Sequence, residues 1–241
     1  MATIPTDFLF RYRLSCRHWK DAALKNVVPE TLGATFRIPI WSRTTALNAW
    51  DSSVPEPRST TGLNPGAESI FDFRFGWADA GLIFTVVVGG KEEQSFARHS
   101  ELASADSLRL CLDTRDVSDR RRGDRFCYKF AFFPFVGESD NVAKPLAQWL
   151  PINRASEPSL HADVDSFALR SELRKDGYAL SVFLPAGAIT GYEPNEFNRI
   201  GMHYTVVDSK YGNFSLQHGA PLPFEDDPGL WSSFIMLGAG E

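Results

Sequence analysis

The sequence predicts an all-β protein, a single-domain antiparallel two-sheet β-sandwich of the jelly-roll or immunoglobulin-like kind, with about ten strands and long loops. Three observations predict this class. Apolar and polar side chains alternate in many short runs, which is the pattern of strands with one buried face. Turn-forming residues separate these runs at hairpin spacing, and no run has a convincing helical period. The 19 Phe, 6 Tyr and 6 Trp residues also favour strands over helices.

The clearest alternation lies in the stretch 105–135. Leu108, Leu110 and Leu112 alternate with polar residues and predict a half-buried strand. After a polar loop, a second run predicts its antiparallel partner, with aromatic side chains at Phe126, Tyr128, Phe130 and Phe132. We expect these two runs to form a central hairpin with a long tip.

Similar runs predict the other strands, which are 8–17, 36–40, 71–77, 82–88, 167–173, 178–184, 200–206 and 230–237. Pro39 places its strand at a sheet edge, because proline cannot donate a ladder hydrogen bond. Asp176 and Gly177 predict a tight hairpin turn. The segments 51–68 and 137–161 have no period and are predicted as long surface loops. We expect one domain over 1–241, in which strands within 8–41 join the same sandwich.

The charge pattern argues against nucleic-acid and membrane partners. The net charge is −5, which is the wrong sign for a nucleic-acid-binding protein. The apolar runs are too short to span a membrane, and the N-terminal residues lack the apolar core of a signal peptide. We therefore expect a cytoplasmic protein.

The cysteines suit the reducing compartment that this location implies. Cys16, Cys111 and Cys127 have no CxxC spacing and leave one thiol over in any pairing. Cys111 and Cys127 lie on the two strands of the central hairpin, where they could be neighbours. We expect them to be buried free thiols.

Four motifs follow one another in a fixed order: ADSLRLCLDTRD, GYALSVFLPAGAI, RIGMHYTVVD and DPGLWSSFIML. In this order they resemble the strand motifs of carbohydrate-binding module family nine and of the wider DOMON-like sandwich group, over about residues 76–237. The resemblance implies a β-sandwich that holds sugars without cutting them. It also implies mainly structural roles for the motif residues Asp106, Asp113, Asp208, Asp227 and Pro228.

The sequence departs from this family at the sugar site. The resemblance implies two Trp rings that clamp the sugar, but the corresponding places hold Leu102-Ala103 and Phe224-Glu225-Asp226. A strand glutamate that would bond sugar hydroxyls is replaced by Arg109. An exposed ring elsewhere can cover the apolar face of a pyranose. The residues that we expect to contact a ligand are Phe224, Trp149, Trp50 and Arg109.

The tip of the central hairpin suggests a second kind of site. Asp113, Asp116, Asp119 and Asp124 lie close together in the sequence, and calcium prefers several carboxylate oxygens from one turn. Five arginines lie between residues 115 and 125, and they would compete for the same carboxylates. A calcium site and a surface ion-pair network are therefore both open interpretations.

No catalytic residue and no other cofactor is predicted. The sequence has no GxSxG and no HExxH motif, and no pattern marks the carboxylate pair of a glycosidase. The predicted function is a non-catalytic carbohydrate-binding-like module, linked to polysaccharide or sugar metabolism, with a carbohydrate or polyol-like ligand. The alternatives are a protein-interaction or assembly domain that has lost sugar binding, and a glycoside-acting enzyme.

Overall fold

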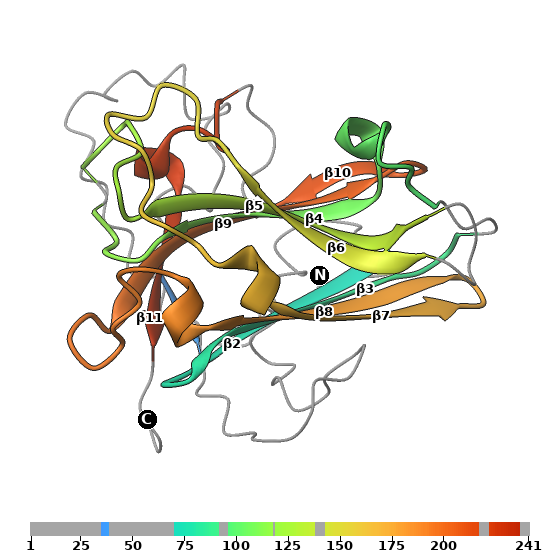
Figure 1. Cartoon of the computed structure of the whole chain (residues 1–241), viewed down its shortest axis with the longest axis horizontal. Helices are drawn as coiled ribbons and strands as arrows, with labels where there is room; N and C mark the ends of the chain where they lie inside the picture. Colours follow the sequence, from blue (N-terminus) through green and yellow to red (C-terminus); the bar gives the residue numbers. More distant parts are fainter. Residues whose placement is uncertain are drawn as a thin grey trace, which may run out of the picture.

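The computed structural model describes residues 35–38, 70–91, 96–117, 119–137, 143–216 and 222–236. These residues form two β-sheets packed face to face, one of seven strands and one of four (Figure 1). The only helical segments in this part of the chain are short 3₁₀ turns. The predicted all-β two-sheet sandwich is therefore confirmed. None of the helical segments within these ranges is long and apolar enough to cross a membrane.

The larger sheet has the strand order β1-β11-β9-β4-β5-β6, and β10 also pairs with β9. Its strands are β1 (Thr35–Ile38), β4 (Ser107–Asp113), β5 (Cys127–Val136), β6 (Lys144–Leu150), β9 (Arg199–Asp208), β10 (Gly212–Ser215) and β11 (Ser232–Met236). β1 is an edge strand, as Pro39 predicted. It runs parallel to β11, whereas the other pairings in this sheet are antiparallel.

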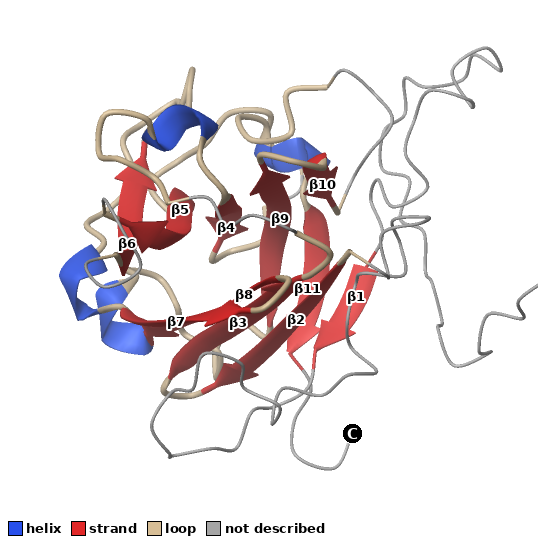
Figure 2. Cartoon of the chain, turned by 90° about the vertical axis from the view of Figure 1, so that its right-hand side faces the viewer, coloured by secondary structure: helices blue, strands red, loops and turns tan. Residues whose placement is uncertain are grey.

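The smaller sheet has the order β2-β3-β8-β7, and Figure 2 shows it facing the larger sheet. Its strands are β2 (Phe71–Ala78), β3 (Gly81–Val88), β7 (Ala168–Arg174) and β8 (Gly177–Pro185). Both predicted hairpins, β2–β3 and β7–β8, are present. Gly177 opens β8, and a Cβ there would lie 1.8 Å from the carbonyl oxygen of Val88. Glycine is required at this position because two backbones approach closely.

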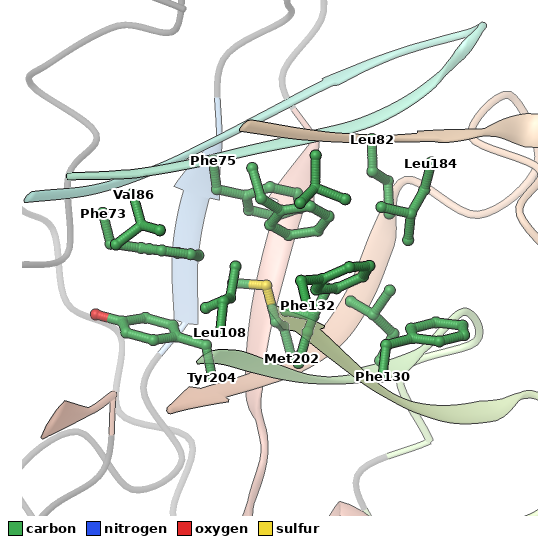
Figure 3. Packing of buried hydrophobic residues seen from close by; sticks show 14 of the residues in the cluster. Phe73, Phe75, Leu82, Val86, Leu108, Phe130, Phe132, Leu184, Met202 and Tyr204 are labelled. Atoms are coloured by element: carbon green, nitrogen blue, oxygen red, sulfur yellow. The ribbon is translucent and has the colours of Figure 1, made fainter. Parts of the chain in front are cut away.

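The core lies between the sheets and is filled by side chains from alternate positions of both. Phe73 of β2 stacks on Tyr204 of β9, with ring centroids 3.9 Å apart. Phe75 meets Phe234 of β11 edge to face, at 5.7 Å. Figure 3 shows these layers pointing toward one another. Each fully buried large apolar side chain stabilises the fold by about 1.5–3 kcal/mol, so this layer holds the two sheets together.

The central hairpin has the predicted pairing, with Leu110 opposite Phe130 and Leu112 opposite Tyr128. Two other predictions were wrong. The segment 137–161, predicted as a loop, contains the edge strand β6, which is mostly half-buried and shows no clean alternation. The short strand β10 lies where only a turn was predicted. The predicted strand 8–17 and the predicted loop 51–68 lie outside the described residues.

Candidate functional site

The outer face of the larger sheet carries polar side chains at its centre. Arg109 of β4 lies opposite Thr205 of β9, and Cys111 lies opposite His203 of β9 and Lys129 of β5. Directly opposite residues of an antiparallel pair project from the same face. Because Leu108 and Leu110 of β4 point into the core, these five side chains point away from it.

The turn 224–226 lies over this face and is held there at each residue. The ring of Phe224 stacks on the His203 ring at 5.3 Å, and Trp231 Nε1 donates a 2.6 Å hydrogen bond to the Phe224 carbonyl. Cys111 Sγ donates a weak hydrogen bond to the carbonyl of Glu225 at 3.6 Å. Phe224 is only 9% exposed. Its predicted role as a stacking platform requires an exposed face, which this arrangement does not provide.

Four charged side chains meet between the sheet and the turn. Arg109 Nη1 lies 3.3 Å from Glu225 Oε1. Lys129 Nζ lies 3.3 Å from Glu225 Oε2 and 3.0 Å from Asp226 Oδ1. We call Arg109, Lys129, Glu225 and Asp226 the outer-face network. It contains two cations and two anions.

Arg109 also connects the two segments that flank this face. Its Nη2 donates a 3.2 Å hydrogen bond to the carbonyl of Ala103, which lies in the 3₁₀ turn η4 (Leu102–Ser104). Its other contact is Glu225 in the turn 224–226. These are the two places at which the sequence resemblance implies clamping Trp rings. The guanidinium therefore bridges the gap between them.

The surroundings keep two members of the network charged. Partial burial disfavours the charged form of Asp226, but hydrogen bonds from Asn153 and the nearby Lys129 ammonium outweigh it and lower the pKa of Asp226. Burial also disfavours the Lys129 ammonium, but Asp226 and Glu225 outweigh that effect and raise the pKa of Lys129. Asp226 therefore stays an acceptor at neutral pH, and Lys129 stays a donor.

Trp149, one of the residues that we expected to contact a ligand, is 37% exposed. It lies near the end of β6, where its ring contacts His161 edge to face at 6.5 Å. It borders a hollow of about 320 Å³. The hollow is lined by Trp149, Leu150, Pro151, Ile152, Ala155, Pro158 and Ser159. Its wall is therefore almost wholly apolar. Trp50, the remaining predicted ring, lies outside the described residues.

The aspartates of the predicted calcium site do not come together. Asp113 accepts main-chain hydrogen bonds from residues 115 and 117 at 2.9 and 2.8 Å. Asp116 pairs with Arg199 at 3.1 Å. Asp124 accepts a hydrogen bond from the N–H of residue 126 at 2.9 Å, while Asp119 is exposed. Among the residues placed by the structure, no group of three or more His, Cys, Asp or Glu side chains is arranged to hold a metal.

Two features were not predicted from the sequence. They are the partners of Arg109 and a separate ion cluster that is buried. The single Lys129 in an otherwise apolar strand was the visible signal for the network. Lys91 is buried, and its ammonium contacts Asp106 Oδ2 and, at 2.8 Å, Asp208 Oδ2. Nothing in the sequence around Lys91 marked it, although both aspartates occupy motif positions.

The two cysteines of the central hairpin are as expected. Cys111 and Cys127 are free and buried, and they pack with Ile152 and Trp231. Burial raises the pKa of both thiols. They therefore act as small apolar side chains beneath the turn and the hollow. Cys16 lies outside the described residues.

Comparison with known proteins places the fold. No family model matches the sequence, and no curated protein matches it. A solved structure of a carbohydrate-binding module family 9 from Caldicellulosiruptor kristjanssonii in complex with cellotriose is 12% identical, with a TM-score of 0.57. The alignment covers 86% of this chain and 95% of that chain.

A second structure of a family 9 module from the same organism, in complex with glucose, is also 12% identical. Its TM-score is 0.58, and the alignment covers 85% of this chain and 97% of that chain. At this identity the similarity concerns the fold. The chain therefore has the β-sandwich fold seen in carbohydrate-binding modules of family 9, which its ordered motifs predicted.

Proposed function

We propose that this protein is a non-catalytic carbohydrate-binding-like module. The observation that carries the proposal is the shared fold, because the two similar structures contain cellotriose and glucose and match 85–86% of this chain. The ligand is a carbohydrate or another polyol, and it contacts the outer face of the larger sheet around the outer-face network.

The network supports this proposal because it offers polar groups to solvent in a fixed arrangement. The side chains of Arg109 and Glu225 are 27% and 26% exposed. Binding sites for polar small molecules place a few donors and acceptors on a rigid frame. Here a sheet strand presents the guanidinium, and a turn fixed at each of its residues presents the carboxylate. Hydroxyl groups fit both.

The ionisation of the network favours holding a ligand over cleaving it. A glycosidase needs one carboxylic acid that is protonated near neutral pH, which requires a raised pKa. The pKa of Asp226 is lowered instead. Lys129 contacts the Asp226 carboxylate, which favours its charged form.

Trp149 supplies a second candidate surface for the same function. Its exposed ring borders an apolar hollow, and an aromatic face can stack on the apolar face of a sugar ring. The hollow lies at the end of the edge strand β6: Leu150 of its lining is directly opposite Lys129 of the outer face, whereas Trp149 is opposite Phe130 of the inner face. Asn153 follows β6, and its side chain donates a hydrogen bond to Asp226 of the network.

A glycan array followed by NMR titration of the full chain tests the proposal. Without an aromatic clamp we expect weak sugar binding, with a Kd on the order of 1 mM or about 4 kcal/mol. Trp149→Ala should weaken binding if the ring stacks on the ligand. Leu173→Ala is the matched control, since Leu173 is equally exposed but lies on the smaller sheet.

The result that would overturn the proposal is a folded protein that binds no glycan at millimolar sensitivity. Capture of a specific protein that no sugar displaces would favour the alternative, a protein-interaction or assembly domain. Turnover in a screen of glycosides would favour the other alternative, a glycoside-acting enzyme.

A further inference from the structure

Only some of the N–H donors of the Arg109 guanidinium are used by the residues that the structure describes. A guanidinium carries five N–H donors, and two of these are used, by Glu225 and by the Ala103 carbonyl. Both contacts, at 3.3 and 3.2 Å, are at the long end of the hydrogen-bond range. In the described ranges no other residue takes the remaining donors. A half-exposed guanidinium with free N–H groups can therefore bind an acceptor from solvent.

The Glu225 carboxylate has acceptor positions to spare. Each of its oxygens makes one long contact, with Arg109 at 3.3 Å and with Lys129 at 3.3 Å. An ionised carboxylate has about four acceptor positions. Because the side chain is partly exposed, donors from a ligand can reach these positions.

The groups beneath this pair hold it in place. Lys129 is only 9% exposed and contacts both carboxylates. Asp226 also accepts hydrogen bonds from the Asn153 main chain at 3.1 Å and from its side chain at 2.9 Å. The side chains of Arg109 and Glu225 are therefore already held in place before a ligand binds. This lowers the entropic cost of binding.

The charge of the network selects the class of ligand. Two cations face two anions, so an acidic ligand meets Glu225 and Asp226, and a basic ligand meets Arg109 and Lys129. Like charges in close contact oppose binding. A hydroxyl group can accept from the guanidinium and donate to the carboxylate at the same time. Neutral ligands with adjacent hydroxyls therefore match both members of the pair.

We propose that Arg109 and Glu225 together bind adjacent hydroxyls of a neutral polyol and discriminate against sugars that carry a charge. This inference rests on the proposed carbohydrate-binding function and names its ligand class and its contact residues. Lys129 and Asp226 act as positioning residues for the pair.

The test is NMR titration of the full chain with glucose, cellotriose, glucuronate and glucosamine. We expect the wild-type protein to bind the two neutral sugars more tightly than the two charged ones. Arg109→Gln should weaken glucose binding about tenfold or more, because hydrogen bonds to charged groups contribute about 1.5–3 kcal/mol. Arg170→Gln is the matched control, since Arg170 is an exposed arginine on the smaller sheet.

Charge-changing variants give the second readout. Glu225→Gln leaves the network with an excess positive charge, so the preference should shift from glucose toward glucuronate. Arg109→Gln leaves an excess negative charge and should shift it toward glucosamine. Unaltered thermal unfolding of each variant would show that the fold is retained.

The outcomes separate this inference from the proposed function. A wild-type protein that binds sugars but prefers glucuronate, or one whose glucose binding survives Arg109→Gln unchanged, overturns the inference and leaves the function standing. A folded wild-type protein that binds none of the four sugars overturns the inference. If no glycan on the array is bound either, the proposed function is overturned as well.

Discussion

Arg109 reverses the charge at a position where the sequence resemblance implies a glutamate, and its neighbours compensate for the reversal. Glu225 lies opposite it, 3.3 Å away in the turn 224–226. The strand therefore supplies the cation and the turn supplies the anion. The strand and the turn thus place a donor and an acceptor side by side on the outer face.

Asp226 gives the network a pH dependence of known sign. Its pKa is lowered in the folded protein, since Asn153 and Lys129 stabilise its charged form more than burial disfavours it. Such a group stabilises the fold above its unfolded pKa and loses this contribution as the pH falls through its folded pKa. Asp226→Asn should therefore reduce the loss of stability below about pH 4, by less than about 1 kcal/mol because the pair is partly solvated.

Urea unfolding of the wild type and of Asp226→Asn at pH 7 and pH 3 measures this effect. Asp165→Asn serves as the control, because Asp165 is exposed and belongs to the 3₁₀ turn 164–166, away from the network. If Asp226→Asn loses as much stability between the two pH values as the wild type does, the lowered pKa of Asp226 is contradicted.

Single residues were predictable only where the strand pattern decides their environment. The alternation placed Leu108 and Leu110 in the core and Arg109 outside it. It could not show that the Phe224 ring turns onto His203 of β9, because that contact depends on how a turn folds back across a sheet. Trp149 was named as a ligand contact from its residue type alone, and the apolar character of the hollow beside it depends on residues 150–159.

At the scale of elements, Lys91 joins the end of a strand in one sheet to two strands of the other. It follows β3 and contacts Asp106 before β4 and Asp208 at the end of β9. The other oxygen of each carboxylate accepts main-chain hydrogen bonds from the turn 209–211. Burial disfavours the Lys91 ammonium, but its two carboxylate partners outweigh this and raise its pKa. The cluster therefore fastens the sheets together at one end.

Lys91→Met should destabilise the fold by about 3–5 kcal/mol, because it leaves two buried carboxylates without their cation. Urea unfolding measures the change. Lys175→Met, at an exposed hairpin turn, should stay within about 0.5 kcal/mol of the wild type. A loss below about 1 kcal/mol for Lys91→Met would show that the cluster contributes little to joining the sheets.

Elements with a clear alternation were predictable, whereas β6 and β10 of the larger sheet were not. β4 and β8 have apolar side chains at every second position, and these strands and their hairpin partners β5 and β7 were found where expected. In β6 only Lys144 and Trp149 are exposed and the other residues are half-buried, so burial leaves little pattern in its sequence. The parallel direction of β1 relative to β11 was likewise hidden, since alternation specifies faces and not directions.

For the whole molecule, the larger sheet has two different faces. Its inner face packs on the smaller sheet through rings such as Phe73 and Tyr204. Its outer face carries the network, and the hollow at Trp149 lies at the end of its edge strand β6. Because the core is formed by the inner face alone, side chains on the outer face can differ without disturbing the packing between the sheets. This separation fits the observation that the fold is similar to that of the two family 9 structures at only 12% identity.

An NMR titration of the full ¹⁵N-labelled chain with glucose and cellotriose tests most directly whether the outer face binds carbohydrate. We predict saturable shifts of the amide signals of Arg109, Lys129 and Glu225, with little change in β2 and β7. A folded protein with no saturable shifts, or with shifts confined to the smaller sheet, would contradict the account.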